Sequence, residues 1–389
     1  MAVNGDQATT ARVAHVTTVD LSLRYLLLNQ LERIRDEGYE VVGISAAGPD
    51  VSTIEAHGIP HVAVPMTRRF TPLADLKALA ALVQVMRRER FDVVHTHTPK
   101  AGLLGQLAAR ISGVPVVVNT LHGFYFHEGT KPLPRRFYIW MERIAARCSD
   151  VILSQNQEDM TTAVAERIAN PELLKWLGNG IDLRRFDRRR IPEEALSELR
   201  AEIGLDAEAP VVGFVGRLVE EKGILDLLEA ARSVLKTIPD AQFLIVGPYD
   251  EEKPDALRPE VADRYGVAEQ CRFLGMRHDM PELYALMDVL VLPSYREGFP
   301  RAPMEASAMG VPAVVTDIRG CREAVEHGEN GLLFPAGDSE ALANAILEVL
   351  GDEARRGAMG RKARQMAEEK FDEQQVFDRV LAEYARLLR

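Results

Sequence analysis

Short β-branched apolar runs alternate with longer segments of helical periodicity along almost the whole chain. The run that begins at Arg12 predicts a first strand, and the amphipathic segment from Leu21 to Glu37 predicts the helix after it, ended by Gly38. Strands that alternate with helices of roughly ten to twenty residues are typical of a doubly wound parallel sheet. Further strands are predicted at residues 40–45, 61–64, 92–95, 114–119 and 150–154.

The same alternation begins again after a polar, basic stretch from Asp182 to Pro192. Asp279 is expected to cap a short helix with Pro281 near its start, and Asp338 is expected to cap another. The chain is predicted to be helical from residue 353 onward. In this half we predict strands at residues 210–215, 242–246, 271–274, 289–292, 312–316 and 331–334, and a helix at 223–236.

A chain of 389 residues is longer than one typical hydrophobic core supports, so two domains are expected. Both halves show the same alternation, which predicts two doubly wound parallel-sheet domains facing each other across a cleft. A small-molecule site is expected in that cleft.

Composition is that of an ordinary soluble enzyme, with 47% hydrophobic and 27% charged residues. No apolar run approaches the roughly 18 residues that span a bilayer. The polar N-terminus carries Asp6 where a secretory signal needs a basic start, which predicts a cytoplasmic protein. Cys148, Cys271 and Cys321 lack the spacing of a disulfide framework or a zinc site, so we expect reduced thiols.

The net charge of −11 is unevenly distributed along the chain. Residues 1–190 hold 24 Lys and Arg against 20 Asp and Glu, and the remaining residues hold 23 against 38. This balance argues against general nucleic-acid binding, but it permits a local contact with anionic lipid or with a pyrophosphate.

Two carboxylates stand out in the stretch from Val289 to Thr316, which predicts strand, turn, helix and strand. Glu297 falls on the turn after the first strand, and Glu305 lies eight residues later on the helix. Ligands of open α/β sheets gather at such turns, so both carboxylates are expected near one crevice. The alternative is coincidence, because the chain carries 58 acidic residues.

A glycine-bounded loop from Gly216 to Gly223 follows the first strand of the second half and opens its first helix. It carries two cations five residues apart, Arg217 and Lys222. A helix N-terminus also favours anions, so the loop suits a diphosphate. The alternative is a solvated loop in which Lys222 balances Glu220 and Glu221.

Histidines follow two strands of the first half. His95 and His97 are two apart at a strand end, a spacing that two metal ligands can share, but no third ligand is spaced to complete a site. We therefore expect no metal and favour structural histidines. His122 follows the next strand and precedes Gly123 in a turn.

These motifs together resemble the retaining, nucleotide-sugar-dependent glycosyltransferases of family 4, which have the GT-B fold of two Rossmann-like domains. The resemblance rests on the Gly216-Arg217-Leu218 loop with Glu221-Lys222-Gly223, and on Glu297-Gly298-Phe299-Pro300 followed by Glu305. It implies that Arg217 and Lys222 contact the donor diphosphate. It also implies that Glu297 binds the donor sugar, that Glu305 binds the ribose, and that His122 lies near the reacting carbon.

The resemblance extends these roles to the neighbouring backbone. The turn Phe273-Leu274-Gly275-Met276 is similar to the family's base-binding turn, and Asn179-Gly180-Ile181-Asp182 to the segment that closes the first domain. Backbone amides at the start of the helix could add donors toward phosphate, although Pro300 has none. The expected catalytic residues are His122, Glu297, Arg217 and Lys222, and the donor-binding set is Gly216, Arg217, Lys222, Met276, Glu297, Gly298, Phe299, Pro300, Arg301, Ala302 and Glu305.

The resemblance implies an acceptor domain at residues 1–186, a donor domain at 187–370 and a final helix at 371–389 that crosses back to the first domain. The implied reaction moves a sugar from a nucleoside diphosphate, with UDP favoured, to a hydroxyl of a lipid-linked glycan in polysaccharide synthesis. Anomeric configuration is retained, and neither metal nor cofactor is needed. The alternatives are a sugar-nucleotide epimerase or hydrolase of the same fold, and a non-catalytic sugar-nucleotide-binding protein.

Two features qualify this resemblance. The loop from Thr18 to Arg24 has no glycine where the family usually has two, so Ser22 or Arg24 could serve the acceptor instead. Basic and aromatic residues cluster at 68–70, 87–90 and 135–140, either as solvated helix faces or as a peripheral contact with an anionic membrane. The second interpretation predicts a protein at the inner face of the cell membrane.

Overall fold

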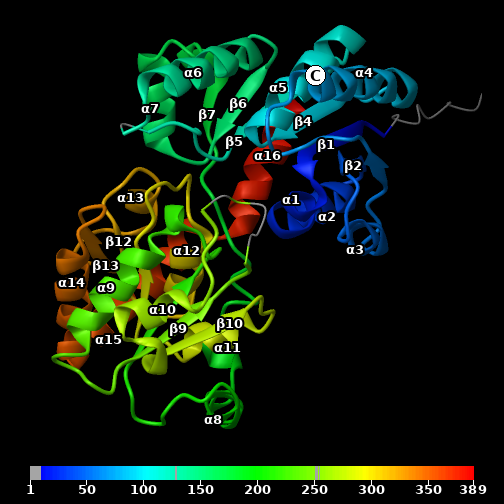
Figure 1. Cartoon of the computed structure of the whole chain (residues 1–389). Helices are drawn as coiled ribbons and strands as arrows, with labels where there is room; N and C mark the ends of the chain where they lie inside the picture. Colours follow the sequence, from blue (N-terminus) through cyan, green and yellow to red (C-terminus); the bar gives the residue numbers. More distant parts are fainter. Residues whose placement is uncertain (1–9, 128, 250–252, 254) are drawn as a thin grey trace, which may run out of the picture. The chain divides into compact units, whose positions relative to one another are not determined.

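The computed structural model describes residues 10–127, 129–249, 253 and 255–389 (Figure 1). The chain forms two compact units: unit 1 comprises residues 1–178 and 375–389, and unit 2 comprises residues 179–374. The sequence places these boundaries after residues 186 and 370, whereas the structure divides the chain after 178 and 374.

Unit 1 is built on a seven-stranded sheet in which every neighbouring pair is parallel. Its strand order is β3-β2-β1-β4-β5-β6-β7. The first six strands confirm the sequence prediction, whereas β7 was not predicted because only Leu174 of its three residues is buried. The strands are β1 (Arg12–Val19), β2 (Glu40–Ala46), β3 (His61–Ala63), β4 (Val93–His97), β5 (Val116–Leu121), β6 (Val151–Ser154) and β7 (Leu174–Trp176).

The predicted helix at residues 21–37 is interrupted. It forms a short α1 (Asp20–Ser22), a π-helical turn η1 (Leu23–Leu27) and then α2 (Leu28–Asp36). Such π-helical turns are rare in proteins, and those that occur are often found at functional sites. The other helices of unit 1 are α3 (Val51–Ala56), α4 (Pro72–Glu89), α5 (Pro99–Ser112), α6 (Pro132–Ala146), α7 (Gln157–Ala165) and the 3₁₀ turn η2 (Pro171–Leu173).

The last helix, α16 (Glu373–Leu387), packs into unit 1 along most of its length (Figure 1, red). Val376, Phe377, Val380 and Tyr384 are buried in one cluster with residues of β1, α2 and β5. Tyr384 is completely inaccessible. The C-terminus therefore supplies part of the core of unit 1.

Unit 2 repeats the architecture with six parallel strands in the order β10-β9-β8-β11-β12-β13. All six predicted strands are present, and all except β10 have most of their side chains buried, as expected for a parallel sheet covered on both faces. They are β8 (Val211–Val215), β9 (Gln242–Val246), β10 (Cys271–Gly275), β11 (Val289–Leu292), β12 (Ala313–Thr316) and β13 (Gly331–Phe334).

The helices of unit 2 test the two predicted caps. Asp338 caps α14 (Ser339–Gly351), accepting a hydrogen bond from the backbone of Ala341 at 2.9 Å. Asp279 precedes α11 (Met280–Ala285) but makes no capping bond, because both carboxylate oxygens accept from Arg277 instead. The remaining helices are η3 (Arg188–Arg190), α8 (Glu193–Glu202), η4 (Glu220–Lys222), α9 (Ile224–Val234), α10 (Val261–Tyr265), η5 (Ala268–Gln270), α12 (Arg301–Ala308), α13 (Cys321–Ala324) and α15 (Glu353–Lys370).

Strand order in both units reverses between the first and fourth strands, β1 and β4 in unit 1 and β8 and β11 in unit 2. At such a switch point the loops after the two strands diverge and leave a crevice at the carboxyl edge of the sheet. The predicted fold class is therefore confirmed, and each unit has a defined place for a ligand.

The three cysteines are free thiols, as expected, with Cys271 and Cys321 buried and Cys148 half-buried. Among the described residues, no helix combines the length and the apolar character needed to cross a membrane.

Candidate functional site

The predicted donor residues of unit 2 follow the two strands that flank its switch point. β8 leads into the loop from Gly216 to Gly223, and β11 leads into the turn from Pro293 to Pro300. Because these strands are neighbours, the two loops lie at the same edge of the sheet.

Lys222 and Glu297 form an ion pair across this crevice, with Lys222 Nζ 2.5 Å from Glu297 Oε1. Their side chains are 18% and 10% exposed. The structure thus brings together two groups that the sequence assigned separately to diphosphate and to sugar. The alternative in which Lys222 balances the adjacent glutamates does not describe this loop, because the Glu221 carboxylate pairs with Arg296 at 2.7 Å.

The charge on Glu221 is itself stabilised by this second pair. Burial would raise the pKa of Glu221, but the hydrogen bond and the charge of Arg296 outweigh burial and lower the pKa below its usual range. The backbone adds a third tie between the loops, since the amide of Tyr295 donates to the carbonyl of Glu221 at 3.0 Å.

Glycines permit this close approach of backbones. Gly223 has φ of +72°, and a Cβ there would lie 2.0 Å from the carbonyl oxygen of Pro293. Gly320, with φ of +90°, leaves a comparable gap, since a Cβ would lie 2.5 Å from the carbonyl oxygen of Gly298. The sequence pointed to Gly223 but not to Gly320, whose only signal was its position shortly after a strand.

Glu305 lies on α12 with its carboxylate held from two sides. Tyr284 donates its hydroxyl to Oε2 at 2.9 Å, and Arg301 Nε lies 3.4 Å from Oε1. Burial raises the pKa of Glu305, opposed by the charge of Arg301 and by both hydrogen bonds. Tyr284 is fully buried on α11, and sequence reasoning missed it because an aromatic residue in an apolar helix is usually core.

The other predicted donor residues lie on the same loops or beside them. Gly216 donates to the carbonyl of Val246 at 2.9 Å, and half-buried Arg217 follows it. Met276 is 48% exposed directly after β10. Gly298 approaches Gly320, Phe299 is buried with its carbonyl bound to Asn179 Nδ2 at 3.0 Å, Pro300 precedes α12, and Arg301 and Ala302 open that helix.

In unit 1 a small pocket opens where β4 and β5 end. His122, Thr98, Gly102 and Glu142 line it, together with Pro99, Gln106, Asn119, Thr120, Leu121 and Gly123. Thr98 has φ of +64° and ψ of 141°, a strained conformation for a β-branched residue that is typical of functional sites. No pattern in the sequence indicates this strain.

His122 is half-buried and held at both ring nitrogens. Nε2 lies 3.1 Å from His97 Nδ1, and Nδ1 lies 3.1 Å from the side-chain oxygen of Gln155. Burial lowers the pKa of His122 to about 4, although the hydrogen bond to Gln155 opposes this. The imidazole is therefore neutral at pH 7. Gln155 was not identified from the sequence.

The glycine-free segment after β1 contacts Asp50, the residue that directly precedes α3. The carboxylate of Asp20 accepts from the backbone of Asp50 at 2.8 Å, and Arg24 forms an ion pair with the Asp50 side chain. Ser22 is buried. A role of Ser22 or Arg24 toward the acceptor stays a prediction.

The aromatic run after His122 divides between core and surface. Phe124 and Phe126 are buried and stacked on each other, with ring centroids 4.9 Å apart. Tyr125 between them is 46% exposed. Of the three, Tyr125 is the residue whose side chain reaches the surface.

Comparisons with known proteins identify the family of this chain. Residues 197–366 match the model of the group 1 glycosyl transferases, and residues 24–180 match a glycosyl transferase 4-like domain. An Escherichia coli UDP-Gal:alpha-D-GlcNAc-diphosphoundecaprenol alpha-1,3-galactosyltransferase is 31% identical over 347 residues, 88% of each chain. The chain belongs to the group 1 glycosyltransferases.

Other relatives of this glycosyltransferase span nearly its whole length. CapM of Staphylococcus aureus, a capsular polysaccharide biosynthesis glycosyltransferase, is 28% identical over 97% of this chain and 98% of its own. The fold is GT-B, as predicted. The Anabaena protein HepE, solved with UDP and glucose, aligns with a TM-score of 0.81 at 24% identity over 97% of this chain and 100% of its own.

Exchange of Lys222 tests the energetic weight of the ion pair. We expect Lys222→Met to lower the free energy of unfolding by about 2 kcal/mol, because Glu297 keeps a mostly buried charge without a partner. The double variant Lys222→Met/Glu297→Gln should recover at least half of that loss in urea denaturation. Lys370→Met is the matched control, since Lys370 pairs with Glu326 at 2.6 Å but both are about half exposed. It should cost less than about 0.5 kcal/mol. Equal losses of unfolding free energy in Lys222→Met and Lys370→Met would contradict the description of the Lys222–Glu297 contact as a mostly buried ion pair.

Glu142 provides a pH-dependent test of the pocket in unit 1. Burial, and secondarily the charge of Asp159, raises the pKa of Glu142 to about 7. The folded state therefore holds this proton more tightly than the unfolded state, and its contribution to stability is lost as pH rises from about 4.5 through about 7. Glu142→Gln should remove that loss, so that the variant gains roughly 1 to 3 kcal/mol on wild type between pH 5 and pH 8.

Urea denaturation at the two pH values measures this gain. Glu172→Gln, at an exposed position of the same unit, should follow the wild-type profile. A Glu142→Gln difference that is the same at pH 5 and pH 8 would show that this carboxyl group does not titrate in the interval.

Proposed function

We propose that this glycosyltransferase moves a sugar from a UDP-sugar to a hydroxyl of a lipid-linked glycan and retains the anomeric configuration. The observation that supports it most is the Lys222–Glu297 ion pair at the switch point of unit 2. It joins a phosphate-binding group and a hydroxyl-binding group at the edge where nucleotides bind to such sheets.

In the proposed binding step the diphosphate replaces Glu297 as the partner of Lys222. Two unit charges 4 Å apart gain about 4 kcal/mol at a partly desolvated surface, and a diphosphate offers more charge than one carboxylate. Glu297 is then released to accept hydrogen bonds from the hydroxyls of the donor sugar. The pair thus holds both side chains in place until the donor arrives.

In the proposed chemical step Arg217 and Lys222 stabilise the charge that develops on the departing diphosphate. These side chains supply the positive charge that a metal ion would otherwise supply. The acceptor hydroxyl attacks on the face of the leaving group, and the departing phosphate takes its proton. Glu297 is therefore a sugar-binding group and not a nucleophile.

The names of the relatives support the finer assignments. The Escherichia coli enzyme transfers from UDP-Gal to a diphosphoundecaprenol-linked sugar and forms an alpha linkage. A Campylobacter jejuni relative, 26% identical over 97% of this chain and 99% of its own, is named for transfer of N-acetylgalactosamine to a diphospho-undecaprenol acceptor, again in an alpha linkage. We therefore propose a polyprenyl diphosphate-linked acceptor here.

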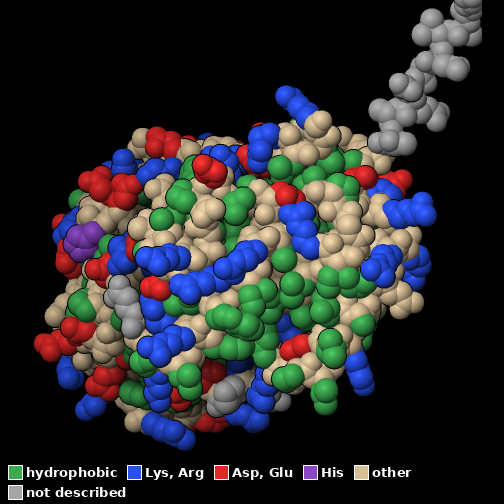
Figure 2. Space-filling model, turned by 90° about the horizontal axis from the view of Figure 1, so that it is seen from above, with side chains coloured by type: hydrophobic (Ala, Val, Ile, Leu, Met, Phe, Trp, Pro, Cys, Tyr) green, Lys and Arg blue, Asp and Glu red, His purple; other side chains and the backbone are tan. Residues whose placement is uncertain are grey.

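A lipid-linked acceptor requires contact with a membrane, and unit 1 offers a suitable surface. Leu73 and Leu76 of α4 are 81% and 65% exposed, and Leu133 and Trp140 of α6 are 79% and 58% exposed. The two groups are joined by Phe70 and Phe137, whose rings meet edge to face at 5.8 Å. Figure 2, which looks from above onto the side of α4 and α6, shows hydrophobic side chains gathered among Lys and Arg.

The cations at this surface come from the clusters that the sequence singled out, Arg68 and Arg69 before α4 and Arg136 on α6. Arg135 of the same cluster is half-buried and pairs with Glu166 at 2.6 Å. Each cation near an anionic leaflet contributes about 1 kcal/mol. Exposed leucine and tryptophan side chains add apolar burial in the headgroup region. We propose that this surface, residues 68–76 and 131–140, rests on the inner face of the cell membrane.

Turnover of defined substrates tests the proposed reaction. With an undecaprenyl diphosphate-linked acceptor, we expect UDP release and a heavier glycan from a UDP-sugar, but not from GDP- or ADP-sugars. Glu297→Gln should lower kcat about a hundredfold, and Glu305→Gln should raise the donor KM about tenfold. Glu329→Gln, at an exposed position of unit 2, serves as the control.

Other outcomes separate the alternatives. UDP release without acceptor would favour a hydrolase or epimerase, and donor binding without turnover would favour a non-catalytic binding protein. Wild-type rates in both Glu297→Gln and Glu305→Gln would contradict the site.

Co-sedimentation with vesicles tests the membrane surface. We expect the protein to bind phosphatidylglycerol vesicles at low salt and to be released by salt, because exposed charges are screened. Leu133→Ser/Trp140→Ser should weaken binding at least about tenfold, since two apolar side chains no longer enter the bilayer interface. Ile111→Ser removes a residue of similar exposure, 52%, on α5 and should bind as wild type. Failure of wild type to sediment with anionic vesicles at low salt would contradict this surface.

A further inference from the structure

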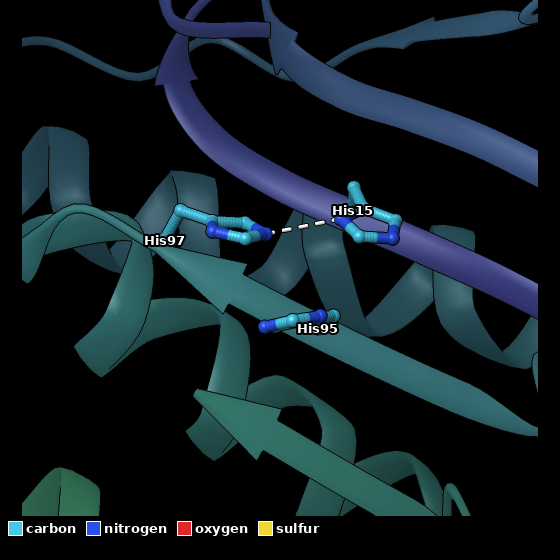
Figure 3. Close-up of side chains that lie close together, drawn as sticks. All are labelled: His15, His95 and His97. Atoms are coloured by element: carbon cyan, nitrogen blue, oxygen red, sulfur yellow. Dashed lines mark hydrogen bonds between the residues drawn. The ribbon is translucent and has the colours of Figure 1, made fainter. Parts of the chain in front are cut away.

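Three histidines meet in the core of unit 1 (Figure 3). One of them, His97, is hydrogen-bonded to the pocket residue His122. His15 comes from β1, and His95 and His97 come from β4. All three are at most 1% exposed, and one nitrogen of each lies within 4.8 Å of the others. Such a group either binds a metal ion or forms a hydrogen-bonded network, and the neighbouring groups distinguish the two.

The hydrogen bonds extend the cluster in both directions. His15 Nδ1 lies 3.0 Å from His97 Nε2, and His97 Nδ1 lies 3.1 Å from His122 Nε2. On the other side, the hydroxyl of Tyr384 lies 3.2 Å from His15 Nε2 and 2.6 Å from His95 Nδ1. The two ends are formed by Thr120, whose hydroxyl lies 2.7 Å from His95 Nε2, and by Gln155, whose side-chain oxygen lies 3.1 Å from His122 Nδ1.

The direction of every hydrogen bond follows from one end. A neutral imidazole donates once and accepts once, and the oxygen of Gln155 can only accept. His122 therefore donates from Nδ1 and accepts at Nε2 from His97 Nδ1. By the same rule His15 Nδ1 donates to His97 Nε2.

The remaining bonds are then fixed in turn. Tyr384 donates its hydroxyl proton to His15 Nε2 and accepts from His95 Nδ1. Thr120 donates to His95 Nε2, which ends the chain. All four rings thus carry their proton on Nδ1, and each donor faces one acceptor. Burial lowers the pKa of all four histidines, which agrees with neutral rings.

These hydrogen bonds argue against a metal ion. A metal would need a free nitrogen from each of three rings, yet all their nitrogens already have hydrogen-bond partners. Among the residues that the structure describes, neither a thiolate nor a carboxylate belongs to the group.

We propose that His97, His15 and Tyr384 are positioning residues that hold His122 in one orientation and in the Nδ1–H tautomer. This rests on the proposed function and on the role that the family resemblance implies for His122, near the reacting carbon. A substrate oxygen that takes the place of Gln155 then meets an N–H group and not a lone pair. His122 consequently acts as a hydrogen-bond donor and not as a general base.

Tyr384 makes the C-terminal helix part of this arrangement. Its hydroxyl is the donor to His15 and the acceptor from His95, so its removal leaves two buried nitrogens unpaired. Gln155 then fixes the proton of His122 from one end alone, and once a substrate oxygen displaces Gln155 the protons of His15, His97 and His122 are free to exchange between the two nitrogens. A residue of the C-terminal helix thereby keeps the tautomer of a pocket residue when Gln155 is displaced.

Nitrogen-15 NMR of the imidazole rings in the whole protein tests this directly. We expect Nδ1–H signals for His15, His95, His97 and His122 in wild type. Gln155→Ala alone should keep Nδ1–H at His122, whereas Gln155→Ala/Tyr384→Phe should give mixed tautomers there. In the presence of Gln155, Tyr384→Phe should lower kcat several-fold with the donor KM unchanged, because the substrate displaces Gln155. Tyr39→Phe is the matched control, because the Tyr39 ring packs edge to face on Tyr384 at 6.0 Å and makes none of these hydrogen bonds. It should leave both the tautomers and kcat unchanged.

Three results would overturn the proposal. They are Nε2–H at His122 in wild type, an identical response of Tyr384→Phe and Tyr39→Phe, and one equivalent of metal in the purified protein with metal-shifted histidine signals. The NMR measurement needs no substrate. It therefore separates failure of the positioning chain from failure of the proposed transferase reaction.

Discussion

The ion pair between Lys222 and Glu297 determines how the donor site can work. Neither side chain is more than a fifth exposed, so each charge depends on the other in the unoccupied site. A ligand that supplies both a diphosphate and a hydroxylated sugar can replace both halves of this interaction at once. A ligand with only one of these parts leaves a charge without its partner. The proposed selection for a sugar nucleotide rests on this pair.

The backbone around the pair is as constrained as the charges. Gly223 against Pro293 and Gly320 against Gly298 allow approaches that no side chain would permit. The Glu221–Arg296 pair adds a second electrostatic tie between the same loops. The site is therefore organised before the donor arrives, which reduces the entropy lost on binding.

The sequence predicted the parts of this protein that depend on local pattern. Buried parallel strands can be predicted from apolar runs. The charged residues of a loop such as Gly216–Gly223 lie within a few positions of one another, so a short stretch of sequence shows them together. The strand β7 was missed because two of its three residues are exposed, and the cap at Asp279 was wrong because Arg277 competes for the carboxylate. Neither outcome is encoded in a short window of sequence.

Contacts between distant residues were beyond such reasoning. Tyr284 supports Glu305 from 21 residues away, and Tyr384 reaches His15 across 369 residues. The third histidine beside His95 and His97 comes from β1 and has no spacing that would reveal it. The sequence therefore identified the residues placed at the crevice, whereas the residues that orient them became visible only in the fold.

A crystal structure of the protein with an intact UDP-sugar tests the role of the ion pair most directly. We predict that Lys222 Nζ lies within hydrogen-bond distance of a diphosphate oxygen and that the Glu297 carboxylate accepts from a hydroxyl of the sugar. A bound donor that leaves the Lys222–Glu297 pair closed, with its diphosphate away from Arg217 and Lys222, would contradict it.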